Sequence, residues 1–259
     1  NRAYVLNNLE SVAYEAGKIL LEMQSRALSL ETPKDIVTDA DLASEKIIMT
    51  KLGEVFPGVP FLSEEAGGEE KQEGLLFVLD PIDGTGNYFL QDDHWSVSIG
   101  LAENGRTIAG VVFMPGKGIM FSAADTIATR APLLSKIRLQ RPMPLNHSQY
   151  WTEWVKEEHG GADNDRACAI MRALHRRTLL PSVRNSATAS LMEIVMGRIA
   201  GHVFSKPTPF DIGAALLIVE QAGGRVTEFD GGPWSVFSPN VLATNGAHHD
   251  ELLRIIDKA

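Results

Sequence analysis

The spacing of apolar residues predicts two helices and a buried strand in the first third of the chain. Apolar side chains over residues 8–24 recur on one helix face. A second helix is expected to begin near Thr38 or Asp39, either of which can cap it, so that Asp41 lies in its first turn. The continuous apolar run 75–79 is typical of a buried strand, and an acidic segment follows it directly.

The rest of the chain mixes both element types. From Trp95 to Ala123, β-type runs alternate with turn residues, which predicts an antiparallel meander. The later elements are expected as helices at 148–158, 164–177, 187–196 and 211–222, strands at 201–205, 225–229 and 241–244, and a final helix. The pattern predicts an α/β (α+β) protein whose halves, 1–140 and 141–259, pack as one compact unit.

Composition narrows the class of partner. The 259 residues are 44% hydrophobic, enough for a substantial core, and carry a formal net charge of −9. Because a nucleic-acid binder needs a basic stripe, no nucleic-acid partner is expected. Cys168 is the single cysteine, so no internal disulfide can form and a reducing, cytoplasmic setting is expected. No apolar run approaches the roughly 20 residues of a membrane span, so no membrane partner is expected.

The segment Asp80-Pro81-Ile82-Asp83-Gly84-Thr85 holds two carboxylates three residues apart, with a stiffening proline, a glycine and a hydroxyl. Such a loop can bind a cation and a phosphate together. Two other interpretations stay open at this point. Asp, Pro and Gly also favour plain turns for local reasons. The haloacid-dehalogenase type of phosphatase also has an acidic loop after an apolar strand, which would make Asp80 a nucleophile, but its two aspartates stand two residues apart.

Four segments taken together are more specific than this loop alone. They read D-I-V-T-D-A-D at 35–41, S-E-E at 63–65, D-P-I-D-G-T at 80–85, and P-F-D-I-G-A-A followed by E-Q-A-G-G between 209 and 224. In this order they resemble the motifs of the inositol monophosphatase family, the lithium-sensitive, magnesium-dependent phosphatases. The resemblance runs over most of the chain and is weakest from about 124 to 180.

The resemblance implies a role for each matching residue. It implies that two or three Mg²⁺ ions are held by carboxylate and carbonyl oxygens, the ligands that this ion prefers. The implied metal ligands are Glu64, Asp80, the Ile82 carbonyl, Asp83 and Asp211, with Asp41 holding a further ion or its water. The implied substrate and phosphate contacts are Asp83, Gly84, Thr85, Ala187 and Asp211. The implied catalytic residues are Glu64, Asp41 and Thr85, which orient and deprotonate a water activated by the metal.

The resemblance also implies the architecture and the reaction. It implies a layered αβαβα sandwich of the sugar-phosphatase type with mixed and antiparallel sheets, a homodimer, and hydrolysis of a small phosphorylated metabolite. Two alternatives stay open: a haloacid-dehalogenase-type phosphatase with Asp80 as nucleophile, and a non-catalytic metal or sugar-phosphate binding protein that kept the motifs.

Two positions depart from the family pattern. Phe210 replaces a tryptophan and keeps an aromatic side chain there. Phe204 falls where inositol-specific members carry a glutamate, and an apolar side chain cannot accept a hydrogen bond from a hydroxyl. The substrate therefore stays open among inositol phosphate and another sugar, nucleotide or histidinol phosphate. Arg184, Arg198 and Lys206 are candidates for contact with a second anionic group.

Other conspicuous residues have plain structural interpretations. His94 is expected in a surface loop, and Cys168 is expected as a small buried residue of a helix. Trp151 and Trp154, three residues apart, are expected to pack against the core or a partner subunit.

Overall fold

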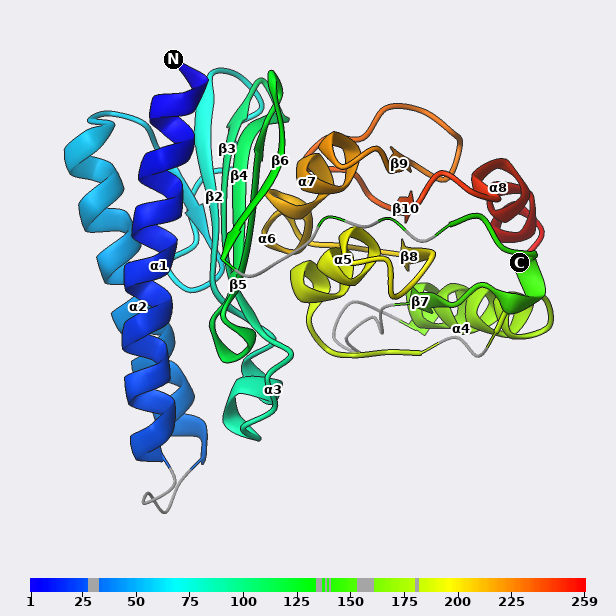
Figure 1. Ribbon diagram of the computed structural model, residues 1–259, viewed down its shortest axis with the longest axis horizontal. Helices are drawn as coiled ribbons and strands as arrows, with labels where there is room; N and C mark the ends of the chain where they lie inside the picture. The colour runs from blue at the N-terminus through cyan, green and yellow to red at the C-terminus, as the bar shows by residue number, and fades with distance from the viewer. Residues whose placement is uncertain (28–32, 134–136, 138, 140, 153–160, 180–181) are drawn as a thin grey trace.

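The first layer consists of two long helices that pack side by side. The computed structural model of the protein describes residues 1–27, 33–133, 137, 139, 141–152, 161–179 and 182–259 (Figure 1). Helix α1 spans Arg2–Ala27 and helix α2 spans Pro33–Val55. Their apolar faces bury residues such as Leu9, Leu20 and Ile48 against the first sheet. The predicted apolar face over 8–24 is confirmed as the buried face of α1.

The second layer is a six-stranded mixed sheet in the order β1-β2-β3-β4-β5-β6. Only the pairing of β1 with β2 is parallel, and the remaining pairs are antiparallel. The strands are β1 (Phe61–Ser63), β2 (Leu75–Asp83), β3 (Ser96–Glu103), β4 (Arg106–Met114), β5 (Ile119–Ala124) and β6 (Ile127–Leu133). The predicted strand at 75–79 and the predicted meander are both confirmed.

The middle and outer layers come from the second half of the chain. Helices α5 (Ala187–Val195), α6 (Pro209–Ile212) and α7 (Ala215–Gln221) lie between the two sheets (Figure 1). The second sheet is also mixed, in the order β7-β8-β10-β9, with bounds Tyr150–Thr152, Gly201–Phe204, Val241–Thr244 and Arg225–Thr227. Helices α4 (Gly161–His175) and α8 (His249–Asp257) cover its far side.

The layers follow from which faces are apolar. The inner helix α5 is buried along its whole length and α7 is buried from Ala215 to Val219, because each is covered by a sheet on either side. The predicted αβαβα sandwich with mixed sheets is confirmed. The predicted boundary at residue 140 falls between the last strand of the first sheet and the first strand of the second, and the division into two halves stays a prediction. Among the described residues, no helix is both long and apolar enough to cross a membrane.

Three element predictions are wrong in detail. Helix α2 begins at Pro33, since proline is well tolerated in a first helical turn, so Asp41 lies in the helix interior. The expected helix 148–158 contains strand β7, and residues 153–160 lie outside the described part. Tyr150 packs into the outer core while Trp151 packs into the middle one, which is the pattern of a strand buried on both faces. The expected helix 211–222 is two short helices, α6 and α7.

Candidate active site

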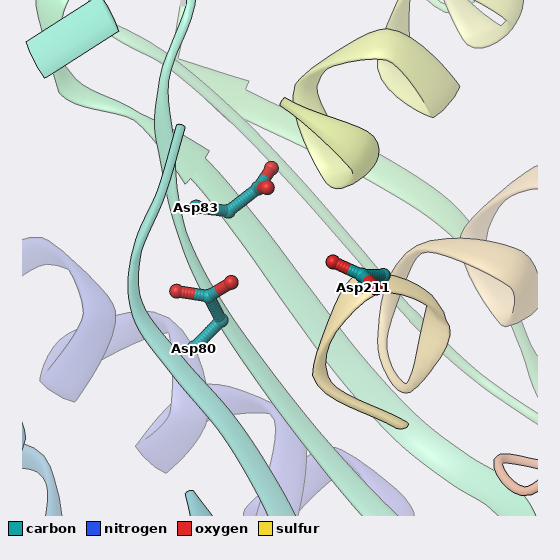
Figure 2. A group of neighbouring side chains, drawn as sticks. All are labelled: Asp80, Asp83 and Asp211. Atoms are coloured by element: carbon teal, nitrogen blue, oxygen red, sulfur yellow. The ribbon is translucent and has the colours of Figure 1, made fainter. Parts of the chain in front are cut away.

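A bulge at the end of β2 brings two carboxylates to one side of the strand. Asp80 pairs with Ser98 and Asp83 pairs with Ser96, so three steps along β2 match two steps along β3. In a regular strand, residues three apart point to opposite faces. The extra residue changes this, and Asp80 and Asp83 leave β2 on the same side (Figure 2).

A third carboxylate reaches the same space from the other half of the chain. Asp211 lies on α6, where its Oδ2 accepts hydrogen bonds from the backbone N (2.6 Å) and the hydroxyl (2.7 Å) of Thr208. The backbone bond is one half of a capping box, whose other half runs from the Asp211 backbone N to the Thr208 side chain, and together they fix the Asp211 side chain in the first turn of the helix. Asp80, Asp83 and Asp211 each offer an oxygen, and these oxygens lie within 4.8 Å of one another.

The electrostatics of this cluster favour a bound cation. Asp80 is buried, and its Oδ1 has no hydrogen-bond partner among the described residues. Burial raises the pKa of Asp80 well above its usual value, and the charges of Glu64, Asp83 and Asp211 raise it further. Carboxylates gathered against their mutual repulsion, with an unsatisfied buried oxygen among them, fit a hard divalent cation such as Mg²⁺.

Glu64 and Asp41 extend the acidic cluster in different ways. Glu64 follows β1, is exposed, and lines the same pocket as the three aspartates. Asp41 is buried on α2 and is not among the described residues that line the pocket. Burial, followed by the charges of Glu65, Glu64 and Glu45, raises the pKa of Asp41 to about 8. The charge of Asp41 therefore acts on the acidic cluster, although Asp41 does not line the pocket.

Glu45 is a supporting residue that sequence reasoning missed. It is buried on α2, accepts a hydrogen bond from the Ser63 hydroxyl, and accepts another from the Ala66 backbone N at 2.9 Å. These bonds tie both sides of the Glu64 segment to α2. The available signal was its position four residues after Asp41, which places both side chains on one helix face.

Asp83 joins the first sheet to helix α5. Its Oδ2 accepts hydrogen bonds from the Ser186 hydroxyl (2.6 Å) and from the backbone N (2.8 Å) and hydroxyl (2.5 Å) of Thr188. Its Oδ1 accepts one from the Ala187 backbone N at 3.0 Å. An anion at a helix N-terminus satisfies amides that have no partner within the helix. Ala187, expected in the substrate pocket, lines that pocket and donates to Asp83.

The loop after Asp83 turns sharply into a short helix. Gly84 adopts φ 90° and precedes α3 (Thr85–Phe89). The Thr85 hydroxyl donates to the Ile82 carbonyl at 3.0 Å, so both of these predicted site residues contact each other. The Asn87 side-chain amide donates to the carbonyls of His94 (2.7 Å) and Arg184 (2.8 Å), which attaches α3 to the segment at Arg184 that also lines the pocket.

Gly84→Ala is expected to impair both stability and activity. A Cβ there would lie 2.9 Å from Cβ of Ser186, and the positive φ strains any L-residue. The matched control is Gly246→Ala, which has φ +89° and no atom within 4 Å of the added Cβ. Both variants should lose about 1 kcal/mol from strain. Only Gly84→Ala should also lose the activity of this site, measured as kcat/KM, and equal activity in the two variants would contradict this packing argument.

The structure corrects several expectations about single residues. His94 is buried, because its ring contacts Ser190 (Nε2 to Oγ, 3.2 Å) and packs against Trp151, so it is not in a surface loop. Cys168 is only half-buried. Trp151 packs in the core as expected, whereas Trp154 lies outside the described residues. Phe204 is fully buried and stacks on His202, which itself lines the pocket.

Comparison with known proteins identifies the family. The chain matches the Inositol monophosphatase family over residues 1–259. This chain belongs to the inositol monophosphatase family. It is 29% identical to an inositol-1-monophosphatase of Bacillus subtilis, covering 91% of this chain and 89% of that protein. It is 28% identical to a fructose-1,6-bisphosphatase/inositol-1-monophosphatase of Thermotoga maritima, covering 87% and 84% of the two chains.

The fold agrees with solved structures of this family. An inositol monophosphatase from Anabaena superposes with a TM-score of 0.88 at 29% identity, over 99% of this chain and 96% of that one. As a member of the inositol monophosphatase family, this chain is a phosphomonoesterase. Its acidic cluster is the candidate metal site of that enzyme.

Proposed function

We propose that this chain hydrolyses a small phosphomonoester at the acidic cluster, with Mg²⁺ as cofactor and water as the attacking group. The observation that carries the proposal is the meeting of Asp80, Asp83 and Asp211 from two halves of the chain, with their oxygens within 4.8 Å. Two or three ions are proposed there. When bound, Mg²⁺ would neutralise charge on the phosphate and promote ionisation of a water near neutral pH.

The chain's own groups then have distinct tasks. Asp80, Asp83, Asp211, Glu64 and the Ile82 carbonyl are proposed to hold the ions. Asp80 Oδ1 supports this, because it is buried and has no other described partner. Asp83 keeps its orientation through its four bonds to residues 186–188, so the ligand geometry is fixed before any ion arrives.

Proton transfer and phosphate binding are assigned to neighbouring groups. Glu64 is exposed in the pocket, where its carboxylate can orient the attacking water and accept its proton. Gly84 and Thr85 are proposed to bind the phosphate through their backbone N–H groups. Asp41 and Thr85 complete the proposed catalytic set. The Thr85 hydroxyl donates to Ile82 in this structure, so its proposed pairing with Asp41 requires that hydroxyl to rotate.

The alcohol released remains open among inositol, other sugars, nucleosides and histidinol. Relatives named for inositol monophosphate and for fructose 1,6-bisphosphate support a sugar or polyol phosphate. A homodimer and inhibition by lithium are proposed on the family resemblance alone.

The test is phosphate release from a panel of phosphorylated compounds, with Mg²⁺ and with EDTA. We expect release that depends on Mg²⁺ and no covalent phosphate on the enzyme. A phosphate trapped on Asp80 would instead establish the dehalogenase-type mechanism. If no compound releases phosphate while Mg²⁺ still raises the melting temperature, the chain is a binding protein rather than an enzyme.

A further inference from the structure

Arg184 is an exposed residue that lines the pocket. Its Cζ lies 5.7 Å from the ring centroid of Trp151. This distance is within the range of a cation–π contact, which holds the planar group in place without neutralising its charge. Among the described residues, no carboxylate forms an ion pair with Arg184.

The backbone of Arg184 is fixed relative to the loop at Gly84 and Thr85, which is proposed to bind the phosphate. Its carbonyl accepts a hydrogen bond from Asn87, a residue of α3, at 2.8 Å. The same amide group of Asn87 donates to the His94 carbonyl at 2.7 Å. Because α3 directly follows Gly84, a phosphate held at that loop has a defined position relative to the Arg184 side chain.

The described charged residues that line the pocket are four carboxylates and one arginine. The carboxylates are assigned to cations, and the arginine is Arg184. His202 also lines the pocket, but burial lowers its pKa to about 3, so it is neutral near pH 7. The other described polar side chains that line the pocket carry no charge; they are Thr85, Thr152, Asn185, Ser186 and Ser190. Arg184 therefore retains its charge for the part of the substrate beyond the transferred phosphate.

Arg198 and Lys206, the other two basic residues named as candidates from the sequence, differ from Arg184 in position. Arg198 donates to Glu193 at 3.0 and 3.1 Å and does not line the pocket. Lys206 is exposed and is not among the described lining residues. Of the three candidates from the sequence, only Arg184 is placed to meet a bound substrate.

We propose that Arg184 binds a second anionic group of the substrate, so that the preferred substrate is a phosphomonoester whose alcohol also carries a carboxylate or another phosphate. The guanidinium offers several N–H donors in one plane, which match two oxygens of either anion. The proposal rests on the proposed function, since it concerns specificity within the same pocket.

The test compares substrates that differ in the second anion. Glycerol 3-phosphate is paired with 3-phosphoglycerate, which adds a carboxylate, and fructose 6-phosphate is paired with fructose 1,6-bisphosphate, which adds a phosphate. The wild type should favour the more anionic member of at least one pair, and that pair identifies the anion. Arg184→Gln should lower kcat/KM for that member about 10- to 100-fold, mainly through KM, because a charge-assisted contact is lost.

Controls separate recognition from folding. Arg184→Gln should leave the less anionic member within about twofold of wild type, and Arg184→Lys should restore part of the preference. Arg177→Gln, an exposed arginine without a place in the pocket, should match wild type throughout. Added salt should raise KM for the preferred member in wild type but not in Arg184→Gln.

Two results overturn the proposal, and they are distinguishable. If wild type releases phosphate equally from both members of each pair, or if Arg184→Gln lowers activity on both members alike, Arg184 does not recognise a second anion. If wild type releases phosphate from no compound with Mg²⁺, the proposed function itself fails and this inference fails with it.

Discussion

Asp80→Asn is expected to raise the melting temperature of the metal-free protein and to abolish its activity. The substitution removes a buried ionisable group whose charged form is disfavoured by burial and by Glu64, Asp83 and Asp211, and no cation compensates that charge when Mg²⁺ is absent. Each kcal/mol gained should add about 2–4 °C in a protein of this size. With Mg²⁺, kcat/KM should fall at least about 100-fold, because a ligand is lost.

The dependence of stability on pH follows from the same cluster. The folded-state pKa of Asp41 is about 8, against 3.8 without the fold, so the folded protein binds more protons between these values. Stability of the metal-free protein is therefore highest at the acidic end of this range and falls as pH rises toward 8. Asp80 acts in the same direction. Thermal melts from pH 5 to 8 in EDTA should show the decline, and saturating Mg²⁺ should reduce it.

A matched control uses an exposed aspartate nearby. Asp93→Asn changes a side chain that is 59% exposed, so it should alter neither the melting temperature nor the effect of Mg²⁺ by much. A lower melting temperature for metal-free Asp80→Asn, together with an unchanged response to Mg²⁺, would contradict the assignment of Asp80 as a metal ligand.

Asp83→Asn should have the opposite effect on stability. An asparagine replaces one carboxylate oxygen with an NH₂ group, which cannot accept the bonds that Ser186 and Thr188 now donate to Oδ2. Buried donors left without an acceptor cost about 1–3 kcal/mol, so the metal-free protein should melt at a lower temperature. Activity should also fall at least about 100-fold, since both a ligand and its support are altered.

A second variant shows how much of the stability lost in Asp83→Asn comes from one hydrogen bond. Thr188→Val removes one hydroxyl donor and keeps the backbone N–H that also binds Asp83. It should lower the melting temperature less than Asp83→Asn and retain more activity. Equal melting shifts of the same sign for Asp80→Asn and Asp83→Asn would show that α5 does not depend on Asp83.

The acidic centre could be predicted from the sequence because its residues lie in short, ordered motifs. Asp80 and Asp83 follow the apolar run at the end of β2, and Asp211 lies in the first turn of α6, so local patterns and the family resemblance point to the same positions. Periodicity predicted most of the separate helices and strands, whereas the layered arrangement was predicted from the family resemblance. The structure adds the bulge, which explains how residues three apart serve one site.

The supporting contacts could not be predicted in the same way. Glu45 acts through Ser63 and Ala66, which are close to it only after α2 packs on the first sheet. His94 follows two aspartates and looks like part of a surface loop, but Ser190 and Trp151 from the second half bury it. Strand β7 is short and apolar on both faces, and periodicity alone does not separate such a run from a buried helix.

The bonds from Asp83 to the start of α5 affect how the protein must fold. Asp83 and Ala187 are separated by 104 positions, so closing this contact orders a long loop of chain. During synthesis, Asp80 and Asp83 leave the ribosome well before α5 exists, and Asp83 then lacks the donors that orient it. The cation centre can therefore form only at a late stage, when the two halves have come together, and a fragment ending near residue 140 would carry most of the acidic residues without the geometry they need.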